Sequence, residues 1–329
     1  MIGEKLKDRW QNNVDVEGYV FNIGGNGKLY EGTTGPESKR PNTDYISGTV
    51  NICTDEEGIN IVPVRFNFVT EKWKSGSEND TWKVLKHVIN TNKTWENVGK
   101  DDAIKVRLQC NVGVNDFPGR DGNMVEAKSI DCSFAHFANN GFSDKRNDFK
   151  FDMLIAAVTP QEVEDGEDYL NLRGYAFNFR GDLIPVTVSV RDKGGIQYFE
   201  NADISNANPM LTNVWGKIVS TTQKIEHEVE SAWGAPQVEY TTRTLRAWDV
   251  TGCSPEPMEW DDESTITLAE FKEALQNRET QKAEAKARQE SRQNQSQKSA
   301  FGSSSKIYDD ETPFDGGTKV SGSMADFKF

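Results

Sequence analysis

The sequence predicts an all-β protein with minor helix, built as two β-barrel domains in tandem and followed by a helix and a disordered acidic tail. Two echoes in the chain indicate the duplication. Residues 18–22 (GYVFN) return as residues 174–178 (GYAFN), and residues 61–64 (IVPV) return, in the same order, as residues 183–186 (LIPV). The two copies lie 34 residues farther apart at the first echo than at the second, which predicts an insertion in the first copy at about residues 24–44.

The first domain, residues 1–137, is predicted from alternating apolar and polar residues. This pattern indicates strands at 14–23, 45–52, 59–69, 103–114 and 124–134. Val62, Val64, Phe66 and Phe68 are expected to share one face of the third strand. Apolar residues at helical spacing between Trp82 and Ile89 predict a helix before the fourth strand, with its cap at residues 79–81. Five strands with a helix between the third and the fourth are typical of the oligonucleotide/oligosaccharide-binding (OB) barrel.

The second OB-like domain is predicted at residues 151–263, after a polar linker at 138–150. Its strands are expected at 151–158, 169–179, 183–190, 217–222 and 238–250, with a helix-like stretch near 209–215. Thr267 and Glu270 form a capping box that opens a helix at 264–288, in which Leu268, Phe271 and Leu275 make a short apolar stripe. Residues 289–329 are predicted to be a flexible linker and acidic tail.

Composition excludes several classes of function. The longest apolar runs are too short to span a bilayer, and the first residues are charged, so we expect a soluble, cytoplasmic protein with no membrane partner. The four cysteines are far apart and form no C-x-x-C pair, which favours buried structural thiols over a metal site. No nucleophile elbow, phosphate loop or His-Glu-x-x-His helix is present, so we expect no enzyme, cofactor or metal.

The net charge of −14 is unevenly distributed. Residues 1–150 contain 20 Lys and Arg against 22 Asp and Glu, whereas residues 151–263 contain 8 against 20. Binding to phosphates depends on the local field and on the counterions released at the contact, and not on the charge of the whole chain. The first domain is therefore the better candidate for a nucleic-acid surface.

Two groups of residues in the first domain are candidates for that surface. Cations interleaved with indoles suit a single strand, because lysines neutralise phosphates while indole faces stack on bases. The first group is Lys72, Trp73, Lys74, Lys93 and Trp95. The second group is the outward face of the second and third strands, with Tyr45, Thr49, Arg65 and Asn67. The alternatives are core packing, above all for Trp95, and an ordinary solvated sheet face.

The tail contains a more specific pattern, with acidic residues followed by proline and phenylalanine. The residues are Asp309, Asp310, Glu311, Pro313 and Phe314. This segment resembles the acidic tip of bacterial single-stranded-DNA-binding proteins, in which carboxylates and a terminal phenylalanine bind replication and repair partners. Here Phe314 does not end the chain, since residues 315–329 follow it, and residues 326–329 (DFKF) are a candidate for a second, cruder acidic and aromatic tip. The alternative is a merely solubilising tail.

The layout of two barrels, linker and acidic tip resembles phage-encoded single-stranded-DNA-binding proteins. The resemblance implies binding of single-stranded DNA without strong sequence preference, protection of that DNA in replication, recombination and repair, and recruitment of partners through the tail. The second domain would pack, extend the groove or mediate self-association. Two alternatives stay open: a structural or virion-assembly protein without a nucleic-acid role, and a recombination mediator or nuclease that uses carboxylates.

Overall fold

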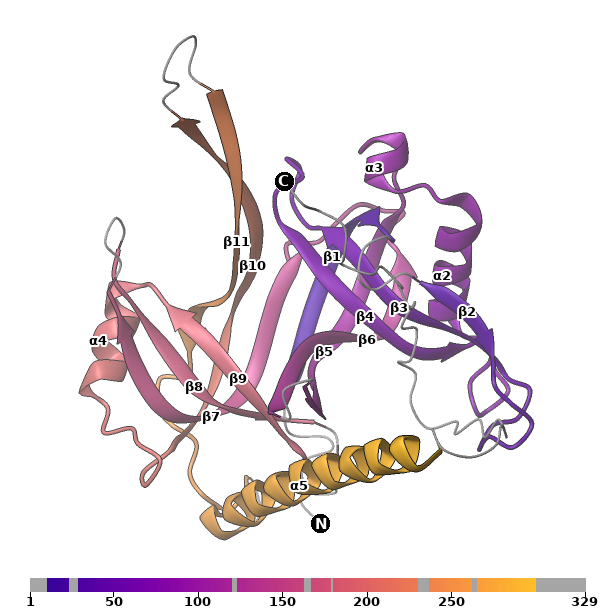
Figure 1. Cartoon of the computed structure of the whole chain (residues 1–329). Helices are drawn as coiled ribbons and strands as arrows, with labels where there is room; N and C mark the ends of the chain where they lie inside the picture. The colour runs from indigo at the N-terminus through magenta and orange to yellow at the C-terminus, as the bar shows by residue number, and fades with distance from the viewer. Residues whose placement is uncertain are drawn as a thin grey trace, which may run out of the picture.

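The computed structural model describes residues 11–23, 29–119, 123–162, 167–178, 180–229, 237–261 and 265–299, and within these the fold is mostly β (Figure 1). The strands form a single eleven-stranded sheet. Those of the first half are β1 Asn12–Asn22, β2 Tyr30–Thr33, β3 Asp44–Cys53, β4 Ile61–Thr70, β5 Lys105–Pro118 and β6 Met124–Phe137. Those of the second half are β7 Asn147–Gln161, β8 Tyr169–Phe177, β9 Leu183–Val190, β10 Met210–Val229 and β11 Gln237–Cys253. The helices are α2 Asp80–Thr91, α3 Trp95–Val98, α4 Lys193–Asn201 and α5 Leu268–Ser299.

The strand pairings follow two circuits of the same order. In the first ring, β1 pairs with β3, β3 with β4, β4 with β6, β6 with β5, and β5 with β1. In the second ring, β7, β8, β9, β11 and β10 are paired in the same sequence. Each ring is closed by a short parallel contact, β4–β6 or β9–β11. A helix precedes the fourth strand of each ring, as the sequence predicts.

Only one of the two sequence echoes marks equivalent positions. Pro63 and Pro185 both lie on the third strand of their rings. In contrast, Gly18 lies on β1, the first strand of its ring, whereas Gly174 lies on β8, the second strand of the other. The prediction that the GYxFN phrase marks the same strand twice is therefore wrong, and so is the size of the insertion calculated from it. The short strand β2 lies within the proposed insertion and pairs with β3.

The two glycines of the GYxFN phrase have the same packing role, which explains why the phrase occurs on different strands of the two rings. A Cβ atom at Gly18 would lie 2.0 Å from the carbonyl oxygen of Cys53 on β3. A Cβ atom at Gly174 would lie 1.9 Å from the carbonyl oxygen of Leu154 on β7. In each ring, a glycine thus allows close approach of the first and second strands, but it is supplied from opposite strands.

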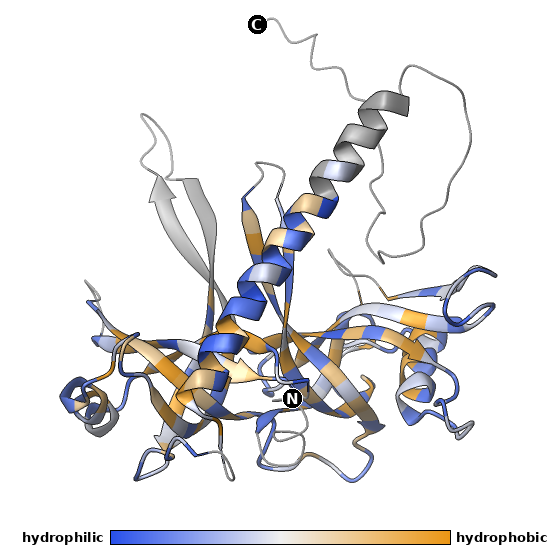
Figure 2. Ribbon diagram, turned by 90° about the horizontal axis from the view of Figure 1, so that it is seen from below, coloured by the Kyte–Doolittle hydropathy of each residue, from blue (hydrophilic) through white to orange (hydrophobic). Residues whose placement is uncertain are grey.

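One apolar core runs through both rings. The largest cluster of buried residues includes Val16 and Leu108 of the first ring as well as Phe151 and Val188 of the second. The antiparallel β1–β7 ladder joins the rings, and it includes Asn147–Phe151, so the predicted polar linker at 138–150 overlaps the start of β7. Figure 2 shows that hydrophobic residues are spread along the strands of both halves, while α5 is mainly hydrophilic. The division into two domains stays a prediction.

The helix of the second ring is not where the sequence analysis places it. Residues 210–215 belong to strand β10, and the helix of this ring is α4, Lys193–Asn201. Gly194 and Gly195 lower helix propensity and so conceal α4. The Asp192 carboxylate compensates by accepting a hydrogen bond from the Gly195 N–H (2.9 Å), and Phe199 is buried in the core.

Helix α5 begins with the predicted capping box. Glu270 N–H donates to Thr267 Oγ1 (3.2 Å), and Thr267 N–H donates to Glu270 Oε2 (3.0 Å). The helix continues to Ser299, beyond the predicted end at residue 288. Phe271 is buried, but Leu268 is 37% exposed, so the predicted apolar stripe is wrong at its first member.

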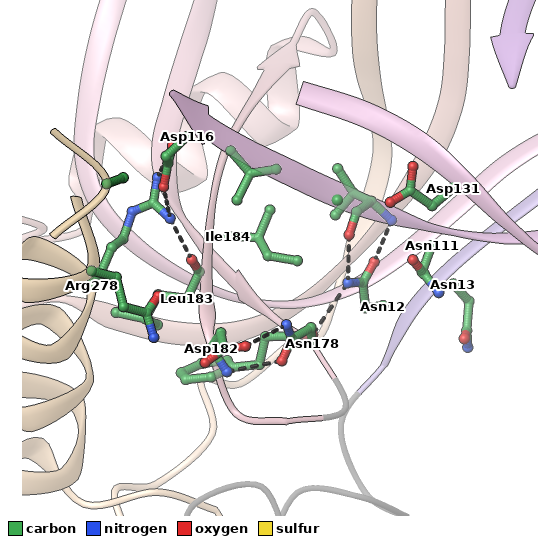
Figure 3. Close-up of a pocket in the computed structure, with 16 residues that line it drawn as sticks. Asn12, Asn13, Asn111, Asp116, Asp131, Asn178, Asp182, Leu183, Ile184 and Arg278 are labelled. Atoms are coloured by element: carbon green, nitrogen blue, oxygen red, sulfur yellow. Dashed lines mark hydrogen bonds and ion pairs between the residues drawn. The ribbon is translucent and has the colours of Figure 1, made fainter. Parts of the chain in front are cut away.

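A buried arginine, Arg278, attaches α5 to both rings (Figure 3). Its side chain is 7% exposed and forms ion pairs with Asp116 (2.9 Å) and Glu126 (3.0 Å) of the β5–β6 hairpin. It also donates a hydrogen bond to the carbonyl oxygen of Leu183 on β9 (3.1 Å). Arg278 lies after the predicted apolar stripe of this helix and was not selected from the sequence.

Candidate nucleic-acid interface

The outward face of β3 and β4 carries the second group of predicted residues. Val62, Val64 and Phe66 are buried inside the ring, so the residues between them point outward. Thr49 and Arg65 are direct cross-strand neighbours on this face. The Asn67 carboxamide lies 3.2 Å from Arg65 Nε, and its oxygen accepts a hydrogen bond when it faces the guanidinium. The structure therefore places Thr49, Arg65 and Asn67 side by side.

Phe68 breaks the alternation of β4 and joins this exposed surface. The prediction that it shares a face with Phe66 is wrong, because its φ of 49° lies in the left-handed region and its side chain is 38% exposed. A positive φ is an outlier for a bulky residue and costs about 1–3 kcal/mol. The Phe68 N–H donates to Ser47 Oγ (2.9 Å), beside a register shift between Ile46 and Gly48 on β3.

Phe68 belongs to an aromatic cluster with a cation beside it. Its ring is stacked on Tyr45, with centroids 4.8 Å apart and an interplanar angle of 27°. Tyr30 on β2 meets Tyr45 edge-on at 6.1 Å, and Arg40 lies 5.7 Å from the Phe68 centroid. We call Tyr30, Arg40, Tyr45 and Phe68 the aromatic cluster. Of its four members, the sequence analysis selected Tyr45 alone.

Arg65 closes the first ring as well as lining its surface. Its guanidinium forms a bidentate pair with Asp131 of β6, with Nε–Oδ1 at 2.7 Å and Nη2–Oδ2 at 2.8 Å. These two residues also form the β4–β6 backbone pair. Two of the five guanidinium donors are thus occupied in the free protein. A phosphate contact by Arg65 stays a prediction.

Lys72, Trp73 and Lys74 lie on the turn that follows β4. All three are exposed, and the Trp73 ring is 41% exposed and lies 5.9 Å from Phe134 on β6, which the sequence analysis did not select. Lys72 and Lys74 form no ion pair with the described residues, whereas Lys83 and Lys86 on α2 are paired with carboxylates. Trp73 and its lysines thus form a second exposed aromatic and cationic surface.

Lys93 and Trp95 lie on other elements than Lys72, Trp73 and Lys74. Lys93 is exposed on the connection between α2 and α3. Trp95 on α3 is half-buried and packs against Tyr19 (5.2 Å) and Phe21 (6.1 Å) of β1. The packing contacts correspond to the core alternative for Trp95, and its predicted role in stacking stays untested.

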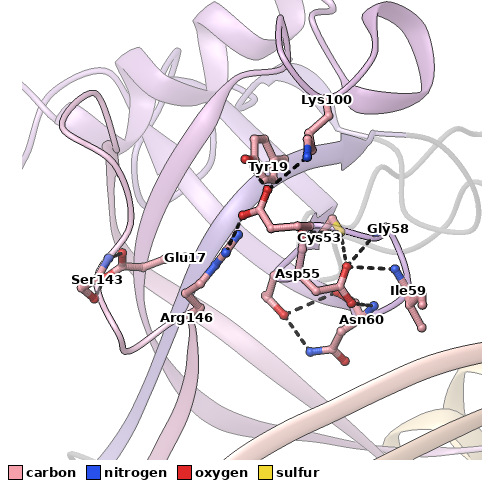
Figure 4. Close-up of polar contacts among 12 residues, drawn as sticks. Glu17, Tyr19, Cys53, Asp55, Gly58, Ile59, Asn60, Lys100, Ser143 and Arg146 are labelled. Carbon is pink, nitrogen blue, oxygen red and sulfur yellow. Dashed lines mark hydrogen bonds and ion pairs between the residues drawn. The ribbon is translucent and has the colours of Figure 1, made fainter.

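A network of hydrogen bonds holds the turn between β3 and β4 of the first ring (Figure 4). Asp55 accepts backbone hydrogen bonds from Gly58 (2.8 Å) and Ile59 (3.0 Å), and these bonds fix the turn before β4. Asn60, at the end of this turn, donates to the Ile218 carbonyl oxygen (3.2 Å) and accepts from Ser220 N–H (2.6 Å) on β10. The turn thus holds the two rings in a fixed relation.

Glu17 on β1 contributes pH-dependent stability. Burial raises the pKa of Glu17, but hydrogen bonds from Ser143 and Arg107 outweigh it and hold the pKa below its ordinary value of 4.5. A lowered pKa means that the ionised side chain stabilises the fold above about pH 4.5, and that this stability is lost as the pH falls through the native pKa. We expect Glu17→Gln to lower the free energy of unfolding in urea at neutral pH, and to lower it much less at about pH 3.

The matched control is Glu31→Gln, which breaks the exposed pair between Glu31 and Lys86 and should change stability by less than about 1 kcal/mol. A stability loss in Glu17→Gln that is the same at both pH values would contradict this role of Glu17.

The cysteines and the search for metal ligands add little to the site. All four cysteines are free, and Cys53 and Cys110 are buried, with burial raising the pKa of the Cys53 thiol to about 12. Among the described residues, no group of three or more His, Cys, Asp or Glu could hold a metal ion. No helix in the described parts of the chain is long and apolar enough to cross a membrane. The predicted partner-binding residues 309–314 lie outside the described residues.

The fold and the surface define a mostly β protein of two strand rings with exposed aromatic and cationic residues on the first. The sequence model of the YorF family matches residues 11–309, and the chain belongs to that family. No curated protein matches it.

The structure is similar to two solved structures from Thermus aquaticus. The wild-type single-stranded DNA binding protein has 9% identity and a TM-score of 0.43, with 76% of this chain and 95% of that chain covered. A deletion mutant of the same protein has 10% identity and a TM-score of 0.43, with 78% and 98% covered.

Proposed function

We propose that both rings are OB-type barrels and that the protein binds single-stranded DNA, without strong sequence preference, on the β3–β4 face of the first. The observation that carries this proposal is Phe68, a bulky residue with a φ of 49° whose exposed ring stacks on Tyr45. Strained residues persist where the surrounding structure holds them, and they cluster at ligand-binding sites. In OB-type barrels this face binds oligonucleotides.

The chemistry of the surface fits a single strand better than a duplex. Aromatic faces stack on unpaired bases of any sequence, at about 1–3 kcal/mol per base, and cations neutralise the phosphates. Tyr30, Tyr45 and Phe68 supply aromatic rings, and Arg40 supplies a cation. The proposed role is that of a non-catalytic, cytoplasmic binding protein that covers DNA during replication, recombination or repair.

The test is a titration of the full-length protein with oligo-dT, followed by intrinsic tryptophan fluorescence. The expected result is quenching, chiefly of the exposed Trp73, that weakens with salt by about 0.7 in log–log slope per phosphate contact. No binding at low salt would exclude the proposal and favour a structural or assembly role. Incubation of labelled strands with the protein and Mg²⁺ tests the enzymatic alternative, since cleaved strands would show a nuclease.

The proposed recruitment of replication and repair proteins rests on the sequence of the tail. Deletion of residues 306–329 is expected to leave affinity for oligo-dT unchanged or raised, because acidic residues that compete for the cationic surface are removed. The same deletion is expected to abolish capture of partner proteins in a pull-down. Clearly weaker DNA binding after the deletion would contradict this division of labour.

A further inference from the structure

A groove between the two rings has a charge unlike that of the rest of the protein. It encloses about 350 Å³ and is lined by β4, β5 and β6 of the first ring and by β9, β10 and β11 of the second. Among the residues that the structure describes, Lys128 of β6 and Arg246 of β11 are its ionisable lining residues, and no Asp or Glu lines it. In a chain with 52 acidic and 38 basic residues, a groove whose described lining has two cations and no carboxylate favours anions.

The two cations of the groove, Lys128 and Arg246, form no ion pair with the residues that the structure describes. Burial lowers the pKa of Lys128, as does repulsion from Arg173 and Arg278, while Glu126 acts in the opposite direction. Glu126 is itself paired with Arg278 (3.0 Å) and Lys282 (2.8 Å). The one carboxylate that acts on Lys128 is therefore shared with two other cations among the described residues.

The opposite walls of the groove are held in place before any ligand binds. Asn60 bonds to both Ile218 and Ser220 of β10 across the rings, and Asn147 donates to the Ile218 carbonyl oxygen (2.8 Å). A preformed groove loses little conformational entropy when it binds a ligand. Ile130, Val186 and Trp248 give it an apolar wall beside the cations.

The groove is continuous with the β3–β4 face along strand β4. Pro63 lines the groove, and Arg65 and Asn67 follow it on the outward side of the same strand. Phe68 of the aromatic cluster lies five residues from Pro63, which corresponds to roughly 17 Å at about 3.4 Å per residue. One extended strand of nucleic acid can therefore reach both surfaces.

We propose that a single strand bound on the β3–β4 face continues into this groove, where Lys128 and Arg246 contact its phosphates. The second ring then contributes directly to binding, although its overall charge is acidic. This inference rests on the proposed function, and it names the path by which the bound strand leaves the first ring.

The experiment measures the salt dependence of oligo-dT binding for the full-length protein and for the double variant Lys128→Ala/Arg246→Ala. Loss of two phosphate contacts should lower the log–log salt slope by about 1.4. The control is Lys272→Ala/Lys286→Ala, which removes two exposed lysines of α5 that form no ion pair with the described residues, and it should leave the slope unchanged. Thermal unfolding of each variant verifies that it is folded.

The outcomes distinguish failure of the groove proposal from failure of the proposed function. If the wild type binds oligo-dT and the groove variant keeps its slope, the groove proposal is wrong and the proposed function stands. If the wild type binds no strand at low salt, both are wrong. If the groove variant loses thermal stabilisation by inorganic tripolyphosphate but keeps its DNA slope, the groove binds a free anion, which overturns the continuation of the strand.

Discussion

Simultaneous replacement of Tyr45 and Phe68 by alanine is expected to weaken oligo-dT binding by roughly 30-fold or more, since each stacked base contributes about 1–3 kcal/mol. The Tyr45 and Phe68 side chains stack on each other at the centre of the aromatic cluster. Anisotropy of a labelled oligo-dT, titrated with the full-length protein, measures the change. Because the substitutions remove no charge, the salt slope should stay the same while the affinity falls.

The control for this variant is Tyr169→Ala. Tyr169 lies on β8 of the second ring, beneath Arg191 at 4.3 Å, so the substitution removes an aromatic ring in contact with a cation at another site. It should leave DNA affinity within about twofold of the wild type. An equal loss in both variants, or no loss in Tyr45→Ala/Phe68→Ala, would exclude the β3–β4 face as the stacking surface.

The variant Phe68→Gly tests whether Phe68 contributes to DNA binding rather than to stability. Glycine adopts a positive φ without strain, which removes a cost of about 1–3 kcal/mol, while its added chain entropy costs about 0.5–1 kcal/mol. The variant should therefore keep its stability in urea and lose affinity for DNA. A large loss of stability would show that Phe68 is needed for packing.

The second large effect is expected for Arg278→Ala, which should lower the free energy of unfolding by about 3 kcal/mol. The substitution removes the partner of Asp116 beneath α5 and the hydrogen bond to Leu183, while Glu126 keeps its pair with Lys282. We place the effect at the lower end of the range for buried pairs because the Glu126 side chain is 36% exposed. Urea unfolding measures the loss, and limited proteolysis should show faster cleavage within α5.

Arg288→Ala is the matched control on the same helix. Arg288 and Glu284 form an exposed pair one helical turn apart, which contributes at most about 0.5 kcal/mol. If Arg278→Ala were no more destabilising than this control, Arg278 would not be what holds α5 against the two rings.

The positions of most strands along the chain were predictable from the sequence, but the equivalence of the repeated positions was not. Alternating residues and turns predict most of the strands, because inner residues such as Val62 and Val64 must be buried. The echo at Gly18 and Gly174 is misleading because close strand approach requires glycine, whichever strand supplies it. The helix α4 was missed because the Asp192 cap and the buried Phe199 outweigh the low propensity of two glycines.

The candidate site was predicted only in part, for a local reason. Period-two alternation places Tyr45, Thr49 and Arg65 on one face, and the structure pairs Thr49 with Arg65 across β3 and β4. It fails at Phe68, where a positive φ turns the ring outward. Gly48 on the paired strand was the available signal, since a glycine within a strand often marks a bulge. The Arg65–Asp131 pair joins residues 66 positions apart, and no local pattern predicts it.

The most direct test of the account is photocrosslinking of oligo-dT to the full-length protein, followed by mass spectrometric mapping of the adducts. Bases stacked on aromatic rings are held in contact with them, so the account predicts adducts at Tyr45 and Phe68, with further adducts along β4 towards the groove. Adducts confined to α5 or to the second ring, with none on β3 or β4, would contradict it.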